Sequence, residues 1–455
     1  MLGGGTFTVQ NKKLPGAYIN FVSAARASAT LSDRGIAAMA VPLSWGPVGE
    51  VIKLEQSDFL YSSRRILGYD YADDALKGLR DLFMGAQTVY LYRLNSTATK
   101  AKNTFAEALY AGVRGNDFSV VIEANADSEE MFDVMTYLGT TQLDIQTVAD
   151  ASELVDNSWL HFLPEAELEQ TAKTPLTGGA DGTVTAGDWQ SAIAKLEGYS
   201  FNTFGAATVD ESVKKLVVQW TKRMRDERGV KFQTVVYDYA EADYEGVISV
   251  NTAAKTASAA ASAKAGSARV GESKAGGDDT EAGAVYWVTG AQAGCRVQSS
   301  LTNATYTGET ELVIDDDQSK LETAIDSGML VFHRVGDEVR VLTDINTLTT
   351  FTEEKSEDFS KNQTIRVIDQ IGNDIAVIFN TQFLGKVNND QSGRISFWSQ
   401  IDTHHKKMQD IRAIENYDNE DIVVMAGEEK GSVVVNDAVQ PTSAMEKLYM
   451  TVRVN

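Results

Sequence analysis

The last ten residues, EKLYMTVRVN, have the pattern of a β-strand that is followed by no turn, helix or polar tail. In such a strand four alternate apolar side chains share one face: Leu448, Met450, Val452 and Val454. Tyr449, Thr451 and Arg453 fall on the other face. Because the backbone N–H and C=O groups of a strand need hydrogen-bond partners, this pattern requires a sheet for residues 441–455 to join.

The first thirty residues have a similar, arm-like character. Short alternating segments containing Phe7 and Val9, and then Ile19 and Phe21, lie between glycines and a Pro-Gly pair. They hold too few apolar residues for a core of their own. We therefore expect residues 1–30 and 441–455 to be extended arms on a globular body.

Length and charge limit the kind of protein. A chain of 455 residues with 43% hydrophobic and 23% charged residues is expected to fold into two to four domains. Its net charge of −23 argues against a primary role on nucleic acid or on an anionic membrane. The chain has no apolar run of about 18 residues and no signal-peptide pattern, so we expect synthesis and folding in a cytoplasm.

Two stretches have the alternating pattern of predicted strands and helices that is typical of an α/β domain, and we assign both to one core domain. Residues 31–95 predict a buried strand from Ala37, a helix with Ser57 as its N-cap, a second helix over 73–83 and a strand over 88–94. Residues 186–348 predict helices over 186–196 and 211–229 and a strand over 231–239. Within this second stretch, residues 251–283 form a low-complexity excursion, and residues 329–345 predict a hairpin around Gly336.

Residues 96–185 differ from the stretches on either side, since they predict short strands and turns. This pattern indicates a β-rich module inserted into the α/β core domain. The Gly-, Thr- and Asp-rich stretch TPLTGGADGTVTAGDW marks its end.

Residues 349–440 predict a C-terminal domain with two amphipathic helices and a small sheet. The apolar positions of the helices are Ile368, Ile371, Ile375, Ile378 and Phe379, and then Ile395, Trp398, Ile401, His405, Met408 and Ile411. The strands that follow carry Ile422 and Val424, and Val433 and Val435.

The sequence offers no catalytic, metal or phosphate site. The only histidines are His161, His333, His404 and His405, and no G-x-S-x-G motif accompanies them. The acidic run Asp315–Asp317 is typical of a solvated turn, and the glycines of LTGGADG match no phosphate-binding motif. The single cysteine, Cys295, excludes an internal disulfide and is expected to be a small buried residue. We predict no enzyme, no cofactor and no metal.

Strand-like arms without a catalytic constellation favour a structural protein that polymerises by β-strand addition. The arm residues Phe7, Val9, Ile19, Phe21, Leu448, Met450, Val452 and Val454 would join sheets of neighbouring copies, with Ile422, Val424, Val433 and Val435 as the acceptor sheet. Three alternatives stay open: the terminal strand folds back onto its own sheet, the chain is a non-contractile adaptor, or it is an α/β hydrolase built around His161 or His333.

Several segments resemble contractile tail sheath proteins of phages and phage-tail-like bacteriocins. They are LPGAYINF, AVPLSWGPVGEV, GVRGNDFSV, LTGGADG, VYWVTGAQAG, FHRVGDEVRVLTDINTL, VIDQIGNDIAVIFN and EKLYMTVRV, in chain order. The resemblance covers nearly the whole chain, and residues 251–283 have no counterpart in it.

The resemblance implies an α/β multidomain fold: a core domain of subtilisin-like topology, an inserted β-sandwich, and an α+β C-terminal domain with extended arms. It implies a helical sheath of many copies that contracts to drive an inner tube through a bacterial envelope, in a virion tail or a phage-tail-like particle. The implied partners are further copies, the tail tube protein, and the baseplate and tail terminator proteins.

A basic cluster in the second C-terminal helix is our predicted contact with the tube: His404, Lys406, Lys407 and Arg412. Such a cluster could meet an acidic surface in an otherwise acidic protein. A solvated helix face is the alternative.

Overall fold

The computed structural model describes residues 31, 34–128, 130–255 and 281–454, and the backbone of strands β1 (Gly4–Gly5) and β2 (Ala17–Tyr18), which pair in parallel. The chain divides into two units. The main unit comprises Asp33–Gln370 and Pro441–Asn455, and the small unit comprises Met1–Ser32 and Ile371–Gln440.

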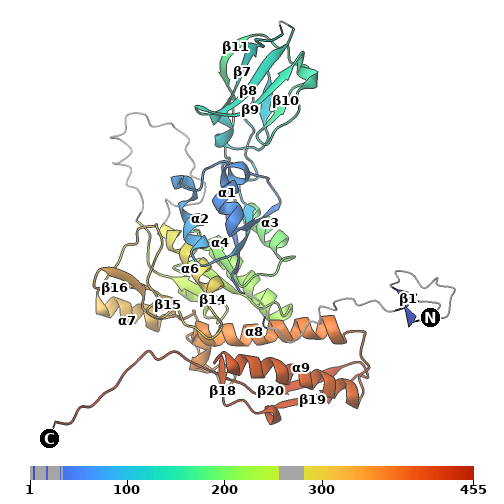
Figure 1. The fold of residues 1–455 in the computed structure, drawn as a ribbon. Coiled ribbons are helices and arrows are strands. Elements are labelled where there is room, and N and C mark those ends of the chain that lie inside the picture. The colour runs from blue at the N-terminus through green and yellow to red at the C-terminus, as the bar shows by residue number, and fades with distance from the viewer. Residues whose placement is uncertain are drawn as a thin grey trace. The chain divides into compact units, whose positions relative to one another are not determined.

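A seven-stranded sheet forms the centre of the main unit (Figure 1). Its strand order is β15 (Met329–Leu330), β14 (Val247–Val250), β13 (Gln233–Tyr237), β12 (Thr203–Ala206), β3 (Ile36–Val41), β5 (Thr88–Arg93) and β4 (Val51–Glu55). All neighbours are parallel except β4 and β5. The mixed α/β architecture expected from the sequence is confirmed.

Helices cover both faces of this sheet. Along β3, Met39 belongs to a core shared with α1 (Gln56–Leu67), α2 (Lys77–Phe83) and α6 (Ala284–Gly294), whereas its neighbour Ala38 packs with α3 (Ala186–Leu196) and α4 (Glu211–Lys222). Because successive strand residues point to opposite faces, the sheet is buried on both sides, which explains why its strands are continuously apolar.

Several predicted boundaries are confirmed and one is wrong. Helix α3 spans the predicted residues 186–196, and β16 (Phe332–Val335) pairs with β17 (Glu338–Val341) around Gly336 as the hairpin pattern predicts. Ser57 is not an N-cap, because α1 already begins at Gln56 with Glu55 as the cap. Cys295 is buried, as expected.

Shorter helical elements lie between the strands and helices of the main unit. They are η1 (Asp74–Leu76), η2 (Val113–Asp117), η3 (Ala151–Glu153), the π-helical turn η4 (Arg223–Glu227), η5 (Ala240–Ala242), η6 (Glu281–Gly283), α7 (Gln318–Asp326) and η7 (Glu357–Ser360).

The stretch between β5 and α3 is β-rich, as predicted. An antiparallel sheet has the order β11 (Thr171–Pro175), β7 (Phe118–Ala124), β8 (Phe132–Leu138) and β9 (Thr141–Val148), and β6 (Ala106–Ala108) pairs with β10 (Leu160–Phe162). Residues of both sheets share one core that contains Phe118, Ile122 and Leu160.

Three of the motifs quoted above meet where this β-rich part joins the seven-stranded sheet. Trp45, from the loop after β3, is fully buried in the β-rich core with its ring centroid 4.9 Å from that of Phe118. Asp181 accepts hydrogen bonds from Ser44 Oγ and Val113 N, both at 2.8 Å. Gly112 has φ +132°, and a Cβ there would lie 2.0 Å from the backbone oxygen of Ser44. The motifs therefore build this junction.

In the small unit two helices pack on a two-stranded sheet. Helix α8 (Asn362–Ile378) begins in the main unit, and from Ile371 onward it belongs to the small unit. The other elements are η8 (Phe379–Phe383), α9 (Gln391–Asp410), β18 (Ile414–Glu415), η9 (Asn419–Asp421), β19 (Ile422–Ala426), β20 (Val433–Asp437) and β21 (Gln440–Pro441).

The predicted apolar faces of the two helices are mostly confirmed. Ile375, Ile378, Trp398 and Ile401 lie in or against the core of the small unit. Ile395 does not, since its side chain is 58% exposed.

Candidate functional site

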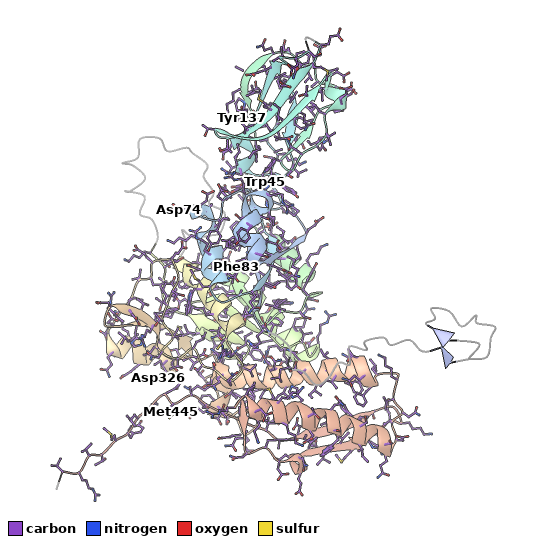
Figure 2. The ribbon with its side chains drawn as sticks, in the orientation of Figure 1. Trp45, Asp74, Phe83, Tyr137, Asp326 and Met445 are labelled. Carbon is purple, nitrogen blue, oxygen red and sulfur yellow. The ribbon has the colours of Figure 1, made fainter. Side chains whose placement is uncertain are left out.

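The C-terminal segment has no secondary structure in the single chain. No residue from Thr442 to Val454 is assigned to a strand or helix. The four side chains of its predicted apolar face are strongly exposed: Leu448 85%, Met450 74%, Val452 70% and Val454 93%. Figure 2 marks Met445 near the start of this extended segment. From Lys447 onward the segment thus presents to solvent alternating apolar side chains and a backbone that pairs with no other described residue.

The root of this segment is tied to the main unit. The backbone N–H of Ala444 donates to Gln363 Oε1 at 3.0 Å. Glu446 accepts from Thr302 Oγ1 at 2.7 Å and from Lys361 Nζ at 2.6 Å. No hydrogen bond or ion pair joins residues 447–454 to another part of the chain that the structure describes. The free segment therefore begins at Lys447.

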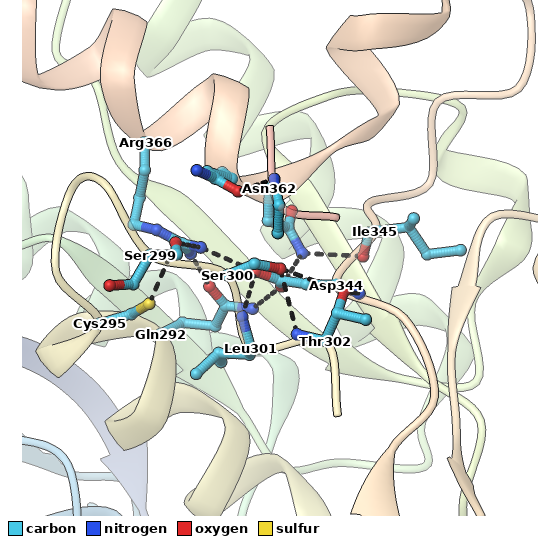
Figure 3. A network of polar contacts seen from close by, with 12 residues as sticks. Gln292, Cys295, Ser299, Ser300, Leu301, Thr302, Asp344, Ile345, Asn362 and Arg366 are labelled. Carbon is cyan, nitrogen blue, oxygen red and sulfur yellow. Dashed lines mark hydrogen bonds and ion pairs between the residues drawn. The ribbon is translucent and has the colours of Figure 1, made fainter. Parts of the chain in front are cut away.

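A buried polar network lies directly behind this anchor (Figure 3). Thr302 Oγ1, which donates to Glu446, accepts the backbone N–H of Asp344 at 2.9 Å. The Asp344 carboxylate binds Arg366 Nη2 at 2.7 Å, Asn362 Nδ2 at 2.8 Å and Gln292 Nε2 at 2.6 Å. Arg366 also donates to the side-chain oxygen of Gln292. The network joins the first turns of α8 to the end of α6.

The electrostatics of this network are those of a structural ion pair. Burial alone would raise the pKa of Asp344, but the Arg366 charge and hydrogen bonds from Leu301 N, Arg366 and Asn362 outweigh it and lower that pKa. Burial raises the pKa of the Cys295 thiol, against the opposing effect of Arg366. A buried thiol with a raised pKa is a poor nucleophile, which agrees with a packing role for Cys295.

The predicted acceptor strands form a sheet with open edges. Strands β19 and β20 are antiparallel, with Val424 opposite Val435, and neither pairs with a third described strand. Ile422, Val424, Val433 and Val435 face the helices of the small unit. On the outer face Val423, Met425 and Val434 are 45%, 42% and 43% exposed. Each strand therefore has one edge that pairs with no described strand, and on the edge of β19 the Ile422 backbone oxygen accepts a hydrogen bond from Trp398 Nε1 at 3.1 Å.

His404 is not a surface residue, so the prediction that it contacts the tube is wrong. The side chains of His404 and His405 are fully buried in the small unit. His404 Nε2 lies 3.0 Å from Asp374 Oδ2, and His405 Nε2 lies 2.9 Å from Asp437 Oδ2. These contacts connect α9 to α8 and to β20. The two carboxylates also give the buried imidazole rings the polar partners that buried polar groups require.

The other members of the basic cluster lie nearer the surface. Lys406 is exposed and pairs with Asp402 at 2.8 Å, Lys407 is half-buried, and Arg412 is exposed with φ +62°. Lys406 and Arg412 are thus exposed near the C-terminal end of α9, and Lys407 is partly exposed there. The four N-terminal arm residues Phe7, Val9, Ile19 and Phe21 lie outside the described residues.

The remaining histidines form no catalytic set in the described part of the chain. His161 Nδ1 lies 2.6 Å from Asp156 Oδ2, and no serine is bonded to His161 there. His333 is on hairpin strand β16. Across residues 34–128, 130–255 and 281–454, no cluster of three or more His, Cys, Asp or Glu side chains could hold a metal ion. Among the same residues no helix is both long and apolar enough to span a membrane.

The sequence could not indicate the anchor or the buried network. Lys361 and Thr302 are 85 and 144 positions away from Glu446. Arg366 is 74 positions from Gln292. The local patterns of these residues are those of ordinary polar positions, so only the fold reveals their contacts.

Comparison with protein families gives four matches that follow one another along the chain. Residues 34–94 match the tail sheath protein Gp18 domain III N-terminal region, and residues 95–181 match the phage tail sheath protein beta-sandwich domain. Residues 182–347 match the phage tail sheath protein central domain, and residues 354–455 match the phage tail sheath C-terminal domain.

Individual relatives agree with these matches. The phage-like element PBSX protein XkdK of Bacillus subtilis is 30% identical over the full length of both chains. The crystal structure of a sheath tail protein from Desulfitobacterium hafniense is similar with a TM-score of 0.80 and 35% identity, covering 96% of this chain and 100% of that one. The helical sheath of the anti-feeding prophage in its contracted state shares the fold, with a TM-score of 0.56 at 12% identity over 97% and 99% of the chains. The chain therefore belongs to the phage tail sheath protein family.

Proposed function

We propose that this chain is the subunit of a contractile sheath that polymerises around an inner tube by exchanging terminal β-strands between copies. Tail sheath proteins are structural proteins rather than enzymes, so the role of the chain is one of assembly. One observation carries the proposal: an alternating segment, 447–454, that pairs with no described part of its own chain, together with a two-stranded sheet whose outer edges pair with no described strand.

The energy of such a joint is adequate for a polymer. A donated strand that makes about six backbone hydrogen bonds, each contributing roughly 0.5–1.5 kcal/mol, gains several kcal/mol before ordering costs. Burial of its apolar side chains adds to this gain. If the N-terminal arm joins a second neighbour through Phe7, Val9, Ile19 and Phe21, each copy is linked to several others and avidity strengthens the lattice.

Contraction is proposed to move the subunit bodies while the strand joints persist. The extended sheath would be a metastable state that is held by its tube and baseplate. Contraction would release free energy because the subunit bodies form larger interfaces with one another in the contracted state. Hydrogen exchange on both forms of the particle tests this part. Amides of residues 448–454 should be protected before and after contraction, and loss of protection in either form would contradict it.

The finer division of the fold is also part of the proposal. We assign residues 31–95 and 186–348 to a core of subtilisin-like topology, 96–185 to the inserted β-sandwich, and 349–440 to the domain that faces the tube. The parallel order β14-β13-β12-β3-β5 with helices on both faces supports the first assignment. The baseplate and tail terminator proteins would bound the polymer in a virion or phage-tail-like particle made in the host cytoplasm.

The direct test is removal of residues 447–455, which leaves the Glu446 anchor intact. Negative-stain microscopy of the purified wild-type protein at high concentration should show long hollow tubes, and the truncated protein should remain folded and dispersed. Tubes formed by the truncated protein would refute strand donation. Dispersed wild-type particles under all salt conditions would favour the non-contractile adaptor.

A further inference from the structure

The free C-terminal segment and strand β19 have matching lengths and opposite flanking charges. Strand β19 contains five residues, Ile422–Ala426, with Asp421 directly before it and Glu428 two positions after it. In the segment, the five residues 448–452 lie between Lys447 and Arg453. Neither the two cations nor the two carboxylates form an ion pair with another described residue. All four side chains are exposed.

The two faces of the segment match those of β19 as well. Ile422 and Val424 of β19 face the helices, and its odd-numbered residues Val423 and Met425 are exposed on the outer face together with Asp421. If Met450 lies opposite Val424, the apolar face of the segment continues the inner face of the sheet. Tyr449 and Thr451 then lie beside Val423 and Met425 and cover their exposed surface.

The same register brings the charges together in either strand direction. In the antiparallel arrangement Arg453 lies opposite Asp421 and Lys447 lies near Glu428, and in the parallel arrangement the two cations exchange places. A slip of two residues keeps the faces but moves a cation away from its carboxylate. The edge of β20 offers no such match, because Lys430, Gly431 and Ser432 precede that strand.

We infer that the C-terminal segment of a second copy docks on the open edge of β19 with Met450 opposite Val424, and that Lys447 and Arg453 fix this register through Asp421 and Glu428. This inference rests on the proposed strand exchange and adds its acceptor strand, its register and the groups that select it. Exposed ion pairs are weak individually, so their role is to choose the register rather than to supply most of the affinity.

Cysteine cross-linking tests the register. One preparation carries Met450→Cys and a second carries Val424→Cys; mixing them under mild oxidation should yield a covalent dimer. Since Met450 faces Val424 in both strand directions, the expected product does not depend on direction. Val452→Cys mixed with Val424→Cys represents the two-residue slip and should give little dimer. Equal or greater yield from the slip pair would overturn the register.

Charge reversal tests the ion pairs. The variant Lys447→Glu/Arg453→Glu should raise the protein concentration needed for assembly about tenfold at low salt and less at about 1 M salt, where screening is strong. Adding Asp421→Lys/Glu428→Lys should restore assembly. The matched control Arg65→Glu/Lys215→Glu reverses two exposed cations far from the segment in sequence and makes the same change in net charge.

The outcomes separate this inference from the proposed function. Assembly of the reversed variant equal to that of the matched control, with truncation of 447–455 still preventing polymerisation, would overturn the charge role and leave strand exchange standing. Normal assembly of the truncated protein would instead refute strand exchange itself. Circular dichroism of the variants confined to residues 447–455 should match the wild type, because no hydrogen bond or ion pair joins residues 447–454 to another described part of the monomer.

Discussion

At the scale of single residues, the buried ion pair of Asp344 and Arg366 joins α8 to the rest of the main unit. Arg366 is 1% exposed and Asp344 is 0% exposed, and both bind further polar groups of the network. A buried pair is costly to break, because removal of one partner leaves an uncompensated charge. The pair is thus a stability element directly behind the anchor of the C-terminal segment.

Asp344→Asn should therefore destabilise the monomer strongly. The neutral amide leaves Arg366 buried without its counter-charge, and we expect a loss of about 3–5 kcal/mol in the free energy of unfolding, measured with urea. Glu311→Gln is the control, since its ion pair with Lys255 is exposed, and it should cause no measurable change. Equal stability of Asp344→Asn and the wild type would show that the pair contributes nothing.

The same pair predicts a dependence on pH. Because the pKa of Asp344 is below its usual 3.8 in the folded state, its contribution is present above that value and is lost as the pH falls through the folded-state pKa. The difference in unfolding free energy between wild type and Asp344→Asn should be constant from about pH 7 to about pH 5 and shrink below about pH 4. A difference that grows in acid would contradict this assignment.

Single-residue predictions from the sequence are confirmed for Cys295 and wrong for Ser57, which is not an N-cap, and for Ile395 and His404. Ile395 fits the apolar period of α9 but lies in its first turns, where its side chain stays exposed. His404 has lysines nearby in sequence, yet it lies one turn above Ile401 on the buried side of α9 and pairs with Asp374. Periodicity does not say which polar residue has a buried partner.

At the scale of elements, helices α2 and α6 approach so closely that only glycine fits at their contact. A Cβ at Gly290 would lie 1.9 Å from the backbone oxygen of Leu82. Backbone atoms cannot move aside as a flexible side chain can, so any side chain at this position forces the helices apart.

Gly290→Ala should accordingly destabilise the monomer by about 1–3 kcal/mol or more in thermal or urea unfolding. Gly187→Ala is its control, because Gly187 is also helical but its added Cβ meets only Thr185 Oγ1 at 3.5 Å. That control should be neutral or slightly stabilising, since alanine favours helix more than glycine does. A smaller loss for Gly290→Ala than for Gly187→Ala would contradict the close packing.

The C-terminal segment is an element whose structure depends on a partner. Met450→Pro removes a backbone donor and cannot occupy a paired strand position without loss, yet an unpaired extended segment tolerates it. We expect unchanged monomer stability and assembly weakened by about tenfold or more, measured by sedimentation. Met450→Ile keeps the donor and suits a strand, so it should assemble like the wild type. Equal assembly of both variants would exclude pairing at residue 450.

Elements with clear periods were predicted well from the sequence, and α6 was not. Helix α3 and the hairpin of β16 and β17 have unambiguous patterns. Helix α6 lies against the sheet with nearly every residue buried, so its sequence AVYWVTGAQAG carries no polar face from which a helical period could be recognised.

At the scale of the whole molecule, the resemblance supplied what local patterns could not. Local patterns predicted which stretches are α/β and which are β-rich. They did not predict the junction of Trp45, Gly112 and Asp181, because these residues come from motifs far apart in the sequence and meet only in the folded chain. The anchor of Glu446 likewise depends on contacts across the fold. The family matches then identified the chain as a tail sheath protein.

Contact with an inner tube is the remaining proposal at this scale. Lys406, Lys407 and Arg412 lie near the end of α9, and we propose that they meet an acidic tube surface. Lys407→Glu/Arg412→Glu should leave self-assembly intact and reduce co-sedimentation with purified tubes about tenfold at low salt. The Arg65→Glu/Lys215→Glu variant is the charge-matched control. Unchanged tube binding by the first variant would assign these cations to a solvated helix face.

The most direct measurement is hydrogen exchange of the backbone amides of residues 448–454 in the monomer and in the polymer. If the chain end pairs only with another copy, these amides should exchange freely in the monomer and become protected in the polymer. Protection already present in the monomer, or free exchange in the polymer, would contradict strand exchange between copies.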